Sequence, residues 1–249
     1  MMAAPPTKTT RSLVDIAPTI AELLGIPLPG ADGVAIPELI DRLQRCDRVV
    51  LIIVDSLGYF TYQRLRPYMP HVQGTVIRCR AVADHTTPAI TSILTGCHPD
   101  THRTFTTADV CTSPIKSVLE LAEERGIKSA VVIESEGAEA MKTKINLVAG
   151  VDDSSDMLDY DTKIKERTIE LLKHEPVLMA VHFRAIDRYA HEARSFDELC
   201  FAAERIDSHI DEICRHLDSN TCVIVCGDHP IHGTCIEDDQ DVALIVLDR

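Results

Sequence analysis

Five short apolar runs, separated by helix-like segments, constrain the fold of this chain more than any other feature. The runs cover residues 48–55, 128–133, 176–183, 221–228 and 241–248, and they are rich in Val and Ile. Continuous apolar runs of this length are typical of strands that are buried on both faces of a sheet. They therefore predict a central sheet covered by other elements on each side.

Three segments between these runs carry apolar residues at helical spacing, over residues 113–126, 161–175 and 195–217. The first opens with Ser113–Pro114, a helix-start signal, and closes on Gly126. The alternation predicts an α/β fold: a mainly parallel central sheet with helices on both faces. Because no repeat or linker divides the chain, we expect a flexible tail over residues 1–10 and a single domain over residues 11–249.

Composition narrows the choice of partners. The chain has 249 residues, a formal net charge of −14 and no Trp. An acidic chain is a poor match for a nucleic-acid duplex or an anionic membrane surface, whereas a bound metal would still allow an anionic small substrate. The first ten residues lack the apolar core of a signal peptide, no run reaches the length of a membrane span, and the nine cysteines contain no CxxC pair. We therefore expect a cytoplasmic protein with reduced thiols.

Potential metal ligands follow three of the predicted strands. In open α/β sheets, ligands bind beyond the carboxyl ends of the strands. Three carboxylates and three imidazoles occupy such positions: Asp55, Asp187, His191, Asp228, His229 and His232. This donor set suits zinc, manganese or iron.

Each of these residues alone has a purely structural interpretation. Asp55 or Asp228 could cap a helix, Asp187 and His191 could form an ion pair along one helix turn, and His232 could be a turn residue. Their combination at one edge of the sheet favours a metal centre.

A hydroxyl nucleophile is available nearby. Thr86 and Thr87 precede Pro88, and "PAITSILTG" predicts a short helix with Pro in its first turn. A hydroxyl at the start of a helix lies where backbone N–H groups and the helix dipole favour an anion. The alternative is that either threonine only caps the helix.

Four motifs together resemble the alkaline phosphatase superfamily, in its nucleotide pyrophosphatase/phosphodiesterase and phosphoglycerate-mutase-like branch. They are "VVLIIVDSLGY", "TTPAITSILTG", "DRYAH" and "GDHPIHG". The resemblance implies an alkaline-phosphatase-like core in which Thr86, ten residues before Gly96, is the nucleophile. It also implies two divalent ions, zinc or manganese: one held by Asp187, His191 and His232, the other by Asp55, Asp228, His229 and Thr86.

The activity implied by this resemblance is hydrolysis of a small phosphorylated substrate through a phosphothreonine. The substrate would be a phosphodiester, a nucleotide pyrophosphate or a phosphomonoester. Thr87 and Arg184 are candidate substrate contacts, as are His85, His98, His102 and Arg103. The alternative for each is a surface or packing residue. The alternative function is a non-catalytic, metal-containing member that binds a phosphorylated ligand.

Some features depart from the family pattern. Pro230 follows the Asp–His pair where the family usually has Gly, and only two residues separate His229 from His232. No sulfatase signature is present, and the chain is too short for the inserted domain of the mutases. The first two departures leave open whether the bimetal site is fully active. The last two favour a hydrolase with an open site over a sulfatase or a mutase. The oligomeric state stays open.

The N-terminal segment "SLVDIAPTIAELLGIPLPGADG" also resembles this superfamily, but in relatives such a stretch follows the last metal-binding His. We therefore expect a circular permutation, with residues 11–33 as the displaced element. It predicts that Ile16–Leu24 packs beside Val242–Val246 and that Arg249 ends near Thr10–Ser12. The alternative is a coincidental amphipathic helix.

Overall fold

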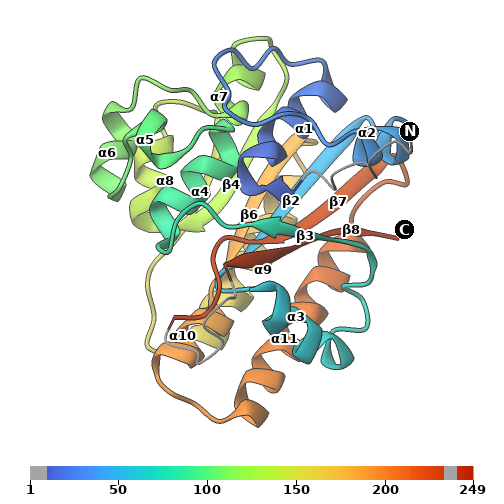
Figure 1. Ribbon diagram of the computed structural model, residues 1–249, viewed down its shortest axis with the longest axis vertical. Helices are drawn as coiled ribbons and strands as arrows, with labels where there is room; N and C mark the ends of the chain where they lie inside the picture. The colour runs from blue at the N-terminus through green and yellow to red at the C-terminus, as the bar shows by residue number, and fades with distance from the viewer. Residues whose placement is uncertain (1–9, 233–239, 249) are drawn as a thin grey trace, which may run out of the picture.

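A computed structural model of the protein describes residues 10–232 and 240–248. Eight strands form one sheet in the order β1-β3-β8-β7-β2-β6-β4-β5 (Figure 1). Only β8 runs antiparallel to its neighbours β3 and β7 among these strands. The strands are β1 (Arg11–Ser12), β2 (Arg48–Val54), β3 (Gly74–Arg80), β4 (Ser129–Glu134), β5 (Leu147–Val151), β6 (Leu178–Phe183), β7 (Thr221–Gly227) and β8 (Asp241–Leu247).

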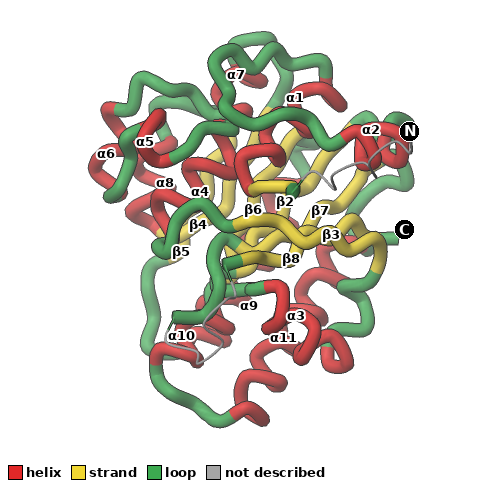
Figure 2. Tube along the Cα trace, viewed as in Figure 1, coloured by secondary structure: helices red, strands yellow, loops and turns green. Residues whose placement is uncertain are grey.

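Helices cover both faces of the sheet, as the sequence predicted (Figure 2). One face carries α1 (Ile16–Leu24), α2 (Pro37–Leu43), α4 (Thr86–Thr95), α7 (Val118–Glu123) and α8 (Ser135–Met141). The other carries α3 (Tyr59–Leu65), α9 (Met157–Leu172), α10 (Ala185–His191) and α11 (Phe196–Cys214). The short helices α5 (Pro99–His102) and α6 (Thr107–Thr112), with the single turns η1 (Leu13–Asp15) and η2 (Arg66–Tyr68), complete the described elements.

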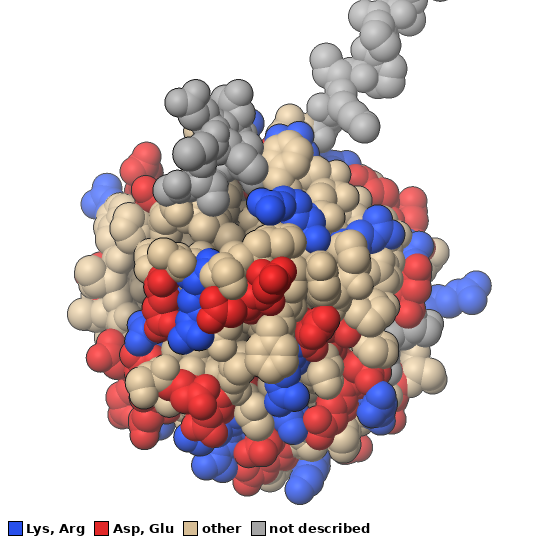
Figure 3. All heavy atoms as spheres, turned by 90° about the horizontal axis from the view of Figure 1, so that it is seen from below, with Lys and Arg blue, Asp and Glu red and all other residues tan. Residues whose placement is uncertain are grey.

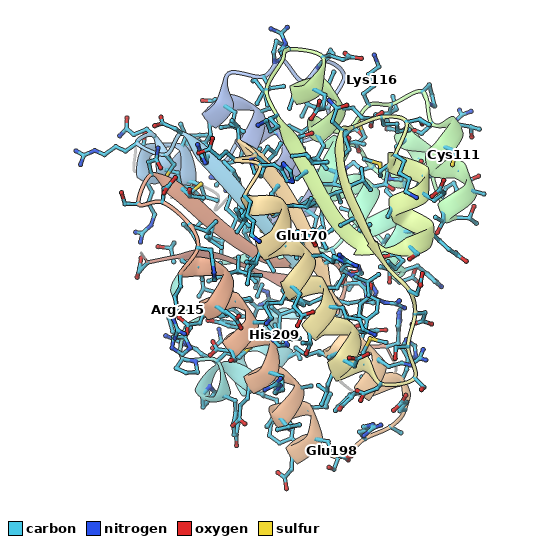
Figure 4. The ribbon with its side chains drawn as sticks, turned by 180° about the vertical axis from the view of Figure 1, so that it is seen from behind. Cys111, Lys116, Glu170, Glu198, His209 and Arg215 are labelled. Atoms are coloured by element: carbon cyan, nitrogen blue, oxygen red, sulfur yellow. The ribbon has the colours of Figure 1, made fainter. Side chains whose placement is uncertain are left out.

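The fully apolar strands explain this two-sided arrangement. All seven residues of β7 and of β8 are buried, because alternate side chains enter the two opposite hydrophobic cores. On one face, α9 and α11 lie side by side, and His209 of α11 stacks on Phe183 of β6 with the ring centroids 6.1 Å apart (Figure 4). Burial lowers the pKa of His209 to about 4, so this histidine is a neutral part of the core.

The start of helix α7 differs from the start that the sequence predicted. It begins at Val118, after the N-cap Ser117, and not at Ser113–Pro114. The Ser117 side chain accepts a hydrogen bond from the backbone N–H of Glu120, and the Glu120 carboxylate accepts one from the backbone N–H of Ser117 at 2.8 Å. This reciprocal capping box satisfies the first free N–H groups, so it fixes the helix start more strongly than the preceding Ser–Pro pair.

The N-terminal helix agrees only in part with the expected permutation. Helix α1 packs on the face of the sheet that includes Val242, Leu244 and Val246, as expected. Arg249 lies outside the described residues, but Leu247 pairs with Gly74 whereas Arg11 pairs with Cys79. The C-terminal end of β8 and strand β1 therefore pair with opposite ends of β3. Up to Asp248, the chain does not approach Thr10–Ser12 as the permutation predicted.

The structure bears on only some of the expectations that were drawn from composition. Eight of the nine cysteines are described and all eight are free; Cys111 is exposed on α6 (Figure 4). Within the described part of the chain, no helix is long and apolar enough to cross a membrane. On the face where α10 and α11 lie, acidic and basic side chains are interspersed (Figure 3). The division into a tail and one domain, and the choice of partners, stay predictions.

Candidate metal centre

Strand register brings the first predicted ligands together. Val54 of β2 pairs with Gly227 of β7, so Asp55 and Asp228 follow directly at neighbouring carboxyl ends (Figure 1). Gly227 is required here, because a Cβ on it would come within 2.2 Å of the backbone carbonyl oxygen of Leu57. The glycine thus lets the loop after β2 pass close to the end of β7.

Asp55, Asp228 and His229 form what we call the inner half of the site. All three are buried, and His229 Nε2 lies 3.3 Å from Asp55 Oδ1 and 3.5 Å from Asp228 Oδ2. Thr86, the first residue of α4, places its Oγ1 3.5 Å from Asp55 Oδ2 and 3.4 Å from His229 Nε2. The candidate nucleophile therefore touches the residues that the resemblance assigns to one metal.

Asp187, His191 and His232 form the outer half. His191 Nε2 lies 3.4 Å from Asp187 Oδ1 along one turn of α10, and the rings of His191 and His232 are 5.5 Å apart. The His232 ring lies 4.7 Å from that of His229, so the two halves are contiguous. The side chain of His191 is 56% exposed, in contrast to 1% for His229.

Ser56, which sequence reasoning passed over, joins the two halves. Its Oγ donates a hydrogen bond to Asp187 Oδ1 at 2.7 Å, and its backbone N–H donates to Asp228 Oδ1 at 3.0 Å. Its Oγ also lies 3.3 Å from His229 Nδ1. The residue is fully buried at a φ of 62°, a left-handed conformation that is unfavourable for serine.

The donor atoms suit a cation. One atom each from Asp55, Asp187 and His229 lie within 4.8 Å of one another, and so do atoms from Asp55, His182 and Asp228. Among the described residues, the buried oxygens Asp55 Oδ1 and Asp228 Oδ2 accept no hydrogen bond. Buried carboxylate oxygens are rarely left without partners, so these atoms and the nearby imidazole are available as metal ligands. His191 and His232 lie outside both of these triads.

The two inner carboxylates differ in proton affinity. Burial raises the pKa of Asp55, but His182, His229 and Arg184 outweigh it and hold the pKa below its usual range. Burial and the neighbouring Asp55 charge raise the pKa of Asp228 to about 7. Two carboxylates so close in a buried site cannot both ionise without cost unless a cation lies between them.

Two further ionisable groups lie behind Asp55. His182 Nε2 is 3.5 Å from Asp55 Oδ2, and His182 Nδ1 is 3.6 Å from Glu134 Oε2. Burial opposes protonation, but the two carboxylates prevail and raise the pKa of His182 to about 10. Glu134 ends β4, so the strand-end rule could have found it; His182 lies inside an apolar strand and gave no such signal.

The predicted substrate contacts fall at different distances from this centre. Arg184 Nε lies 3.9 Å from Asp55 Oδ2, and Thr87 follows Thr86 at the start of α4. His85 is exposed, with its ring 5.8 Å from that of His232. His102 is instead a buried structural residue, because its Nδ1 accepts a hydrogen bond from the Thr104 backbone at 3.0 Å.

Two other candidate contacts lie in the loops that follow α4. His98 is exposed, and its backbone N–H donates a hydrogen bond to Asp32 Oδ2 at 2.8 Å. Arg103 is an exposed residue with a φ of 53° that ends α5.

A cavity of about 80 Å³ adjoins the nucleophile. It lies between α4 and the layer formed by β4 and α8, and the segment containing α6 also lines it. Thr86, Thr87 and Glu134 contribute to its wall, so the cavity shares residues with the metal centre.

The comparisons with known proteins agree with this fold. The family model described as the metalloenzyme superfamily matches residues 117–238, slightly less than half of the chain. This segment contains five of the predicted ligands: Asp187, His191, Asp228, His229 and His232. No curated protein matches the sequence significantly.

Solved structures share the fold at low sequence identity. Phosphonoacetate hydrolase from Sinorhizobium meliloti 1021 is 15% identical with a TM-score of 0.57; the match covers 74% of this chain and 56% of that one. A protein of the alkaline phosphatase superfamily from Vibrio parahaemolyticus is 15% identical (TM-score 0.54, coverage 82% and 60%). The 2-O GAG sulfatase BT1596 is 11% identical (TM-score 0.60, coverage 82% and 64%). This chain thus spans less than two thirds of each of these relatives.

Together, the family model and these neighbours support the metalloenzyme or alkaline phosphatase superfamily that the motifs indicated. They do not distinguish the nucleotide pyrophosphatase and mutase-like branch from the others.

Proposed function

We propose that the protein is a metal-dependent hydrolase of phosphoric esters that uses Thr86 as its nucleophile. The observation that carries the proposal is the position of Thr86 Oγ1, within 3.5 Å of both Asp55 and His229, at the start of a ten-residue helix. The family match and the neighbouring phosphonoacetate hydrolase support hydrolysis at phosphorus. The proposed substrate is a phosphodiester, a nucleotide pyrophosphate or a phosphomonoester. We also propose that the protein is cytoplasmic.

Two divalent ions, zinc or manganese, would be held by the inner and outer halves. When bound, they supply positive charge that lowers the pKa of a hydroxyl and stabilises the oxygens of the phosphoryl group. Ser56 holds Asp187 and Asp228 in place, and the backbone N–H groups that begin α4 favour an anion beside Thr86.

In the proposed reaction, Thr86 Oγ bonds to phosphorus as the bond to the leaving oxygen breaks, and the leaving oxygen takes up a proton. A water oxygen then bonds to phosphorus, the bond to Thr86 Oγ breaks, and the threonine regains its proton. The net change is addition of one water across the ester. Arg184 and Thr87 would orient the substrate.

The test is the turnover of aryl phosphomonoesters and phosphodiesters by Thr86→Ala. We expect a loss of about 1,000-fold or more, because removing a nucleophile leaves only the residual catalysis of the site. The fold and most metal binding should be kept, and Thr87→Ala, which would lose only a substrate contact, should lose much less turnover than Thr86→Ala. If Thr87→Ala were inactive and Thr86→Ala active, the nucleophile would be assigned one residue too early.

The second candidate function is a non-catalytic protein that binds a phosphorylated ligand. The exposure of the outer half and the short spacing between His229 and His232 favour it. Two bound metals with no turnover on any ester would support binding over catalysis.

We also propose that residues 11–33 are a permuted C-terminal element. The position of α1 on the sheet face that includes Val242, Leu244 and Val246 supports this. Because Arg11 and Leu247 pair with opposite ends of β3, an unpermuted chain would need a connecting segment between them. A chain that starts at Cys46 and carries residues 11–45, including the partly buried helix α2, after Asp248 through a linker should fold and bind metal. A chain that fails to fold with linkers of every length would contradict the permutation.

A further inference from the structure

Apart from Glu134, whose carboxylate lies 3.6 Å from His182, the cavity beside Thr86 is mostly apolar in what it offers a ligand. Ile90 and Leu94 of α4, Ile133 of β4 and Met141 of α8 contribute side chains to its wall. All four are buried members of the same hydrophobic core. A cavity lined in this way favours hydrocarbon over water.

The hydroxyl groups of two threonines in this wall are already used. Thr91 Oγ1 donates to the Thr87 carbonyl oxygen at 2.9 Å, and Thr95 Oγ1 donates to the Thr91 carbonyl oxygen at 2.7 Å. Each bond returns to the helix backbone four residues earlier. These hydroxyls therefore add little polarity to the cavity.

The charged groups at the other end of the cavity are also partnered. Lys144 Nζ donates to the Val110 carbonyl oxygen at 2.8 Å and lies 3.4 Å from Glu120 Oε1. Both side chains are mostly buried, at 14% and 12% exposure. A charged ligand group would have to break this pair, so the cavity disfavours one.

Because the cavity adjoins the candidate metal centre, the position of Thr86 indicates which apolar group of a substrate would enter it. Thr86 belongs to the cavity wall, and its Oγ1 lies in the inner half of the site. A phosphoryl group in reach of Thr86 Oγ1 would thus place one of its substituents at the cavity mouth. Resting on the proposed function, we propose that this cavity is a substrate subsite for a small, uncharged aliphatic group attached to the phosphoryl group.

The volume sets the size of this group. A space of about 80 Å³ exceeds what one water needs several-fold. We expect room for an aliphatic chain of about three to five carbons. Each methylene that enters should strengthen binding about 4-fold, until the cavity is full.

Two binding measurements test the subsite without relying on turnover. The first follows the melting temperature of the metal-free chain with pentan-1-ol, which probes the cavity alone. The second is calorimetric titration of the zinc- or manganese-loaded chain with methyl-, propyl- and pentylphosphonate, which are not esters. We expect saturable stabilisation by pentan-1-ol and a dissociation constant that falls from methyl- to pentylphosphonate by at least about 10-fold.

Thr91→Leu is the matched variant, because it adds volume to the cavity wall and removes only a hydroxyl bonded to its own helix. It should abolish both the alcohol effect and the chain-length dependence, while methylphosphonate binds as before. Thr162→Leu is the control: Thr162 Oγ1 donates to the Leu158 carbonyl oxygen at 2.7 Å and lies 3.4 Å from His209 Nε2, but on α9, outside the cavity wall. It should leave both measurements unchanged.

The outcomes separate the two proposals. Equal binding of the three phosphonates, or equal chain-length dependence in wild type and Thr91→Leu, would overturn the subsite while leaving the phosphohydrolase intact. Stabilisation by pentan-1-ol with no binding of any phosphonate would overturn the phosphoryl site, and with it the assignment of the cavity to a substrate. An absent alcohol effect would show that the cavity takes no aliphatic group.

Discussion

The inner and outer halves of the candidate metal centre contain similar side chains in very different surroundings. Asp55, Asp228 and His229 are each at most 1% exposed, at the ends of two paired central strands. In the outer half, Asp187 and His191 come from the seven-residue helix α10, and His232 is an exposed residue beyond β7.

This difference has a thermodynamic consequence. The inner side chains are already fixed by packing, so binding a cation there costs little further conformational entropy. The outer histidines must be ordered when they bind. We therefore expect the inner half to bind its ion more tightly, and the two halves to respond differently to substitution.

The largest effect should come from the inner half. Asp228→Asn keeps an oxygen to accept the hydrogen bonds from Ser56 and His229 but removes the charge. We expect loss of the tighter ion and a fall in turnover of about 1,000-fold or more. Measured metal content and kcat/KM would check both.

For the stability of the metal-free chain, we expect Asp228→Asn to be favourable, in contrast to its effect on turnover. Burial and Asp55 raise the pKa of Asp228 to about 7, so keeping this carboxylate ionised at pH 8 costs folding free energy. A neutral Asn removes that cost. The metal-free variant should therefore melt at a higher temperature than metal-free wild type at pH 8, and a lower melting temperature would argue against crowded carboxylates.

A smaller effect is expected from the outer half. His191→Gln removes a ligand that is more than half exposed. It should weaken only the second ion and lower turnover about 10- to 100-fold, with recovery at high metal concentration. If it removed both ions, the two halves would be one cooperative site.

Ser56→Gly tests the link between the halves. Glycine tolerates the left-handed conformation at φ 62° but lacks the hydroxyl that donates to Asp187. We expect the free energy of unfolding to change by less than about 1 kcal/mol, and affinity for the outer ion to fall about 10-fold. Glu175→Gly, at φ 54° on the surface, is the control and should leave metal binding unchanged.

The smallest effect concerns a carboxylate–imidazole pair away from the metal centre. His71 Nδ1 lies 2.7 Å from Asp207 Oδ2, and this contact raises the pKa of His71. A raised histidine pKa stabilises the fold below its unfolded value of about 6.5, and the stabilisation is lost as pH rises through the folded pKa.

His71→Gln should therefore lose stability relative to wild type at pH 5.5 but not at pH 9. The difference should stay under about 1 kcal/mol, because the His71 side chain is 51% exposed. Chemical denaturation at the two pH values measures it. Added zinc or manganese should not change the difference, in contrast to every substitution in the metal centre.

The sequence predicted the fold well where one rule decided the structure. The five apolar runs became β2, β4, β6, β7 and β8, and the strand-end rule correctly placed Asp55 and Asp228 at neighbouring carboxyl ends. The short strands β1 and β5 were missed because two and five residues carry too little pattern to stand out.

The site was predictable only for residues in recognisable motifs. Ser56 and His182 act through contacts with residues more than 120 positions away, such as Ser56 with Asp187 and His182 with Asp55. No local spacing reveals such contacts. The cavity beside Thr86 likewise depends on how α4 packs against β4 and α8, and no single segment encodes it.

The most direct test of the unequal halves is a calorimetric titration of the metal-free chain with zinc and, separately, with manganese. The account predicts two ions per chain in two resolved steps, with the tighter step lost in Asp228→Asn and the weaker one in His191→Gln. Two equal steps, one ion, or none would contradict it.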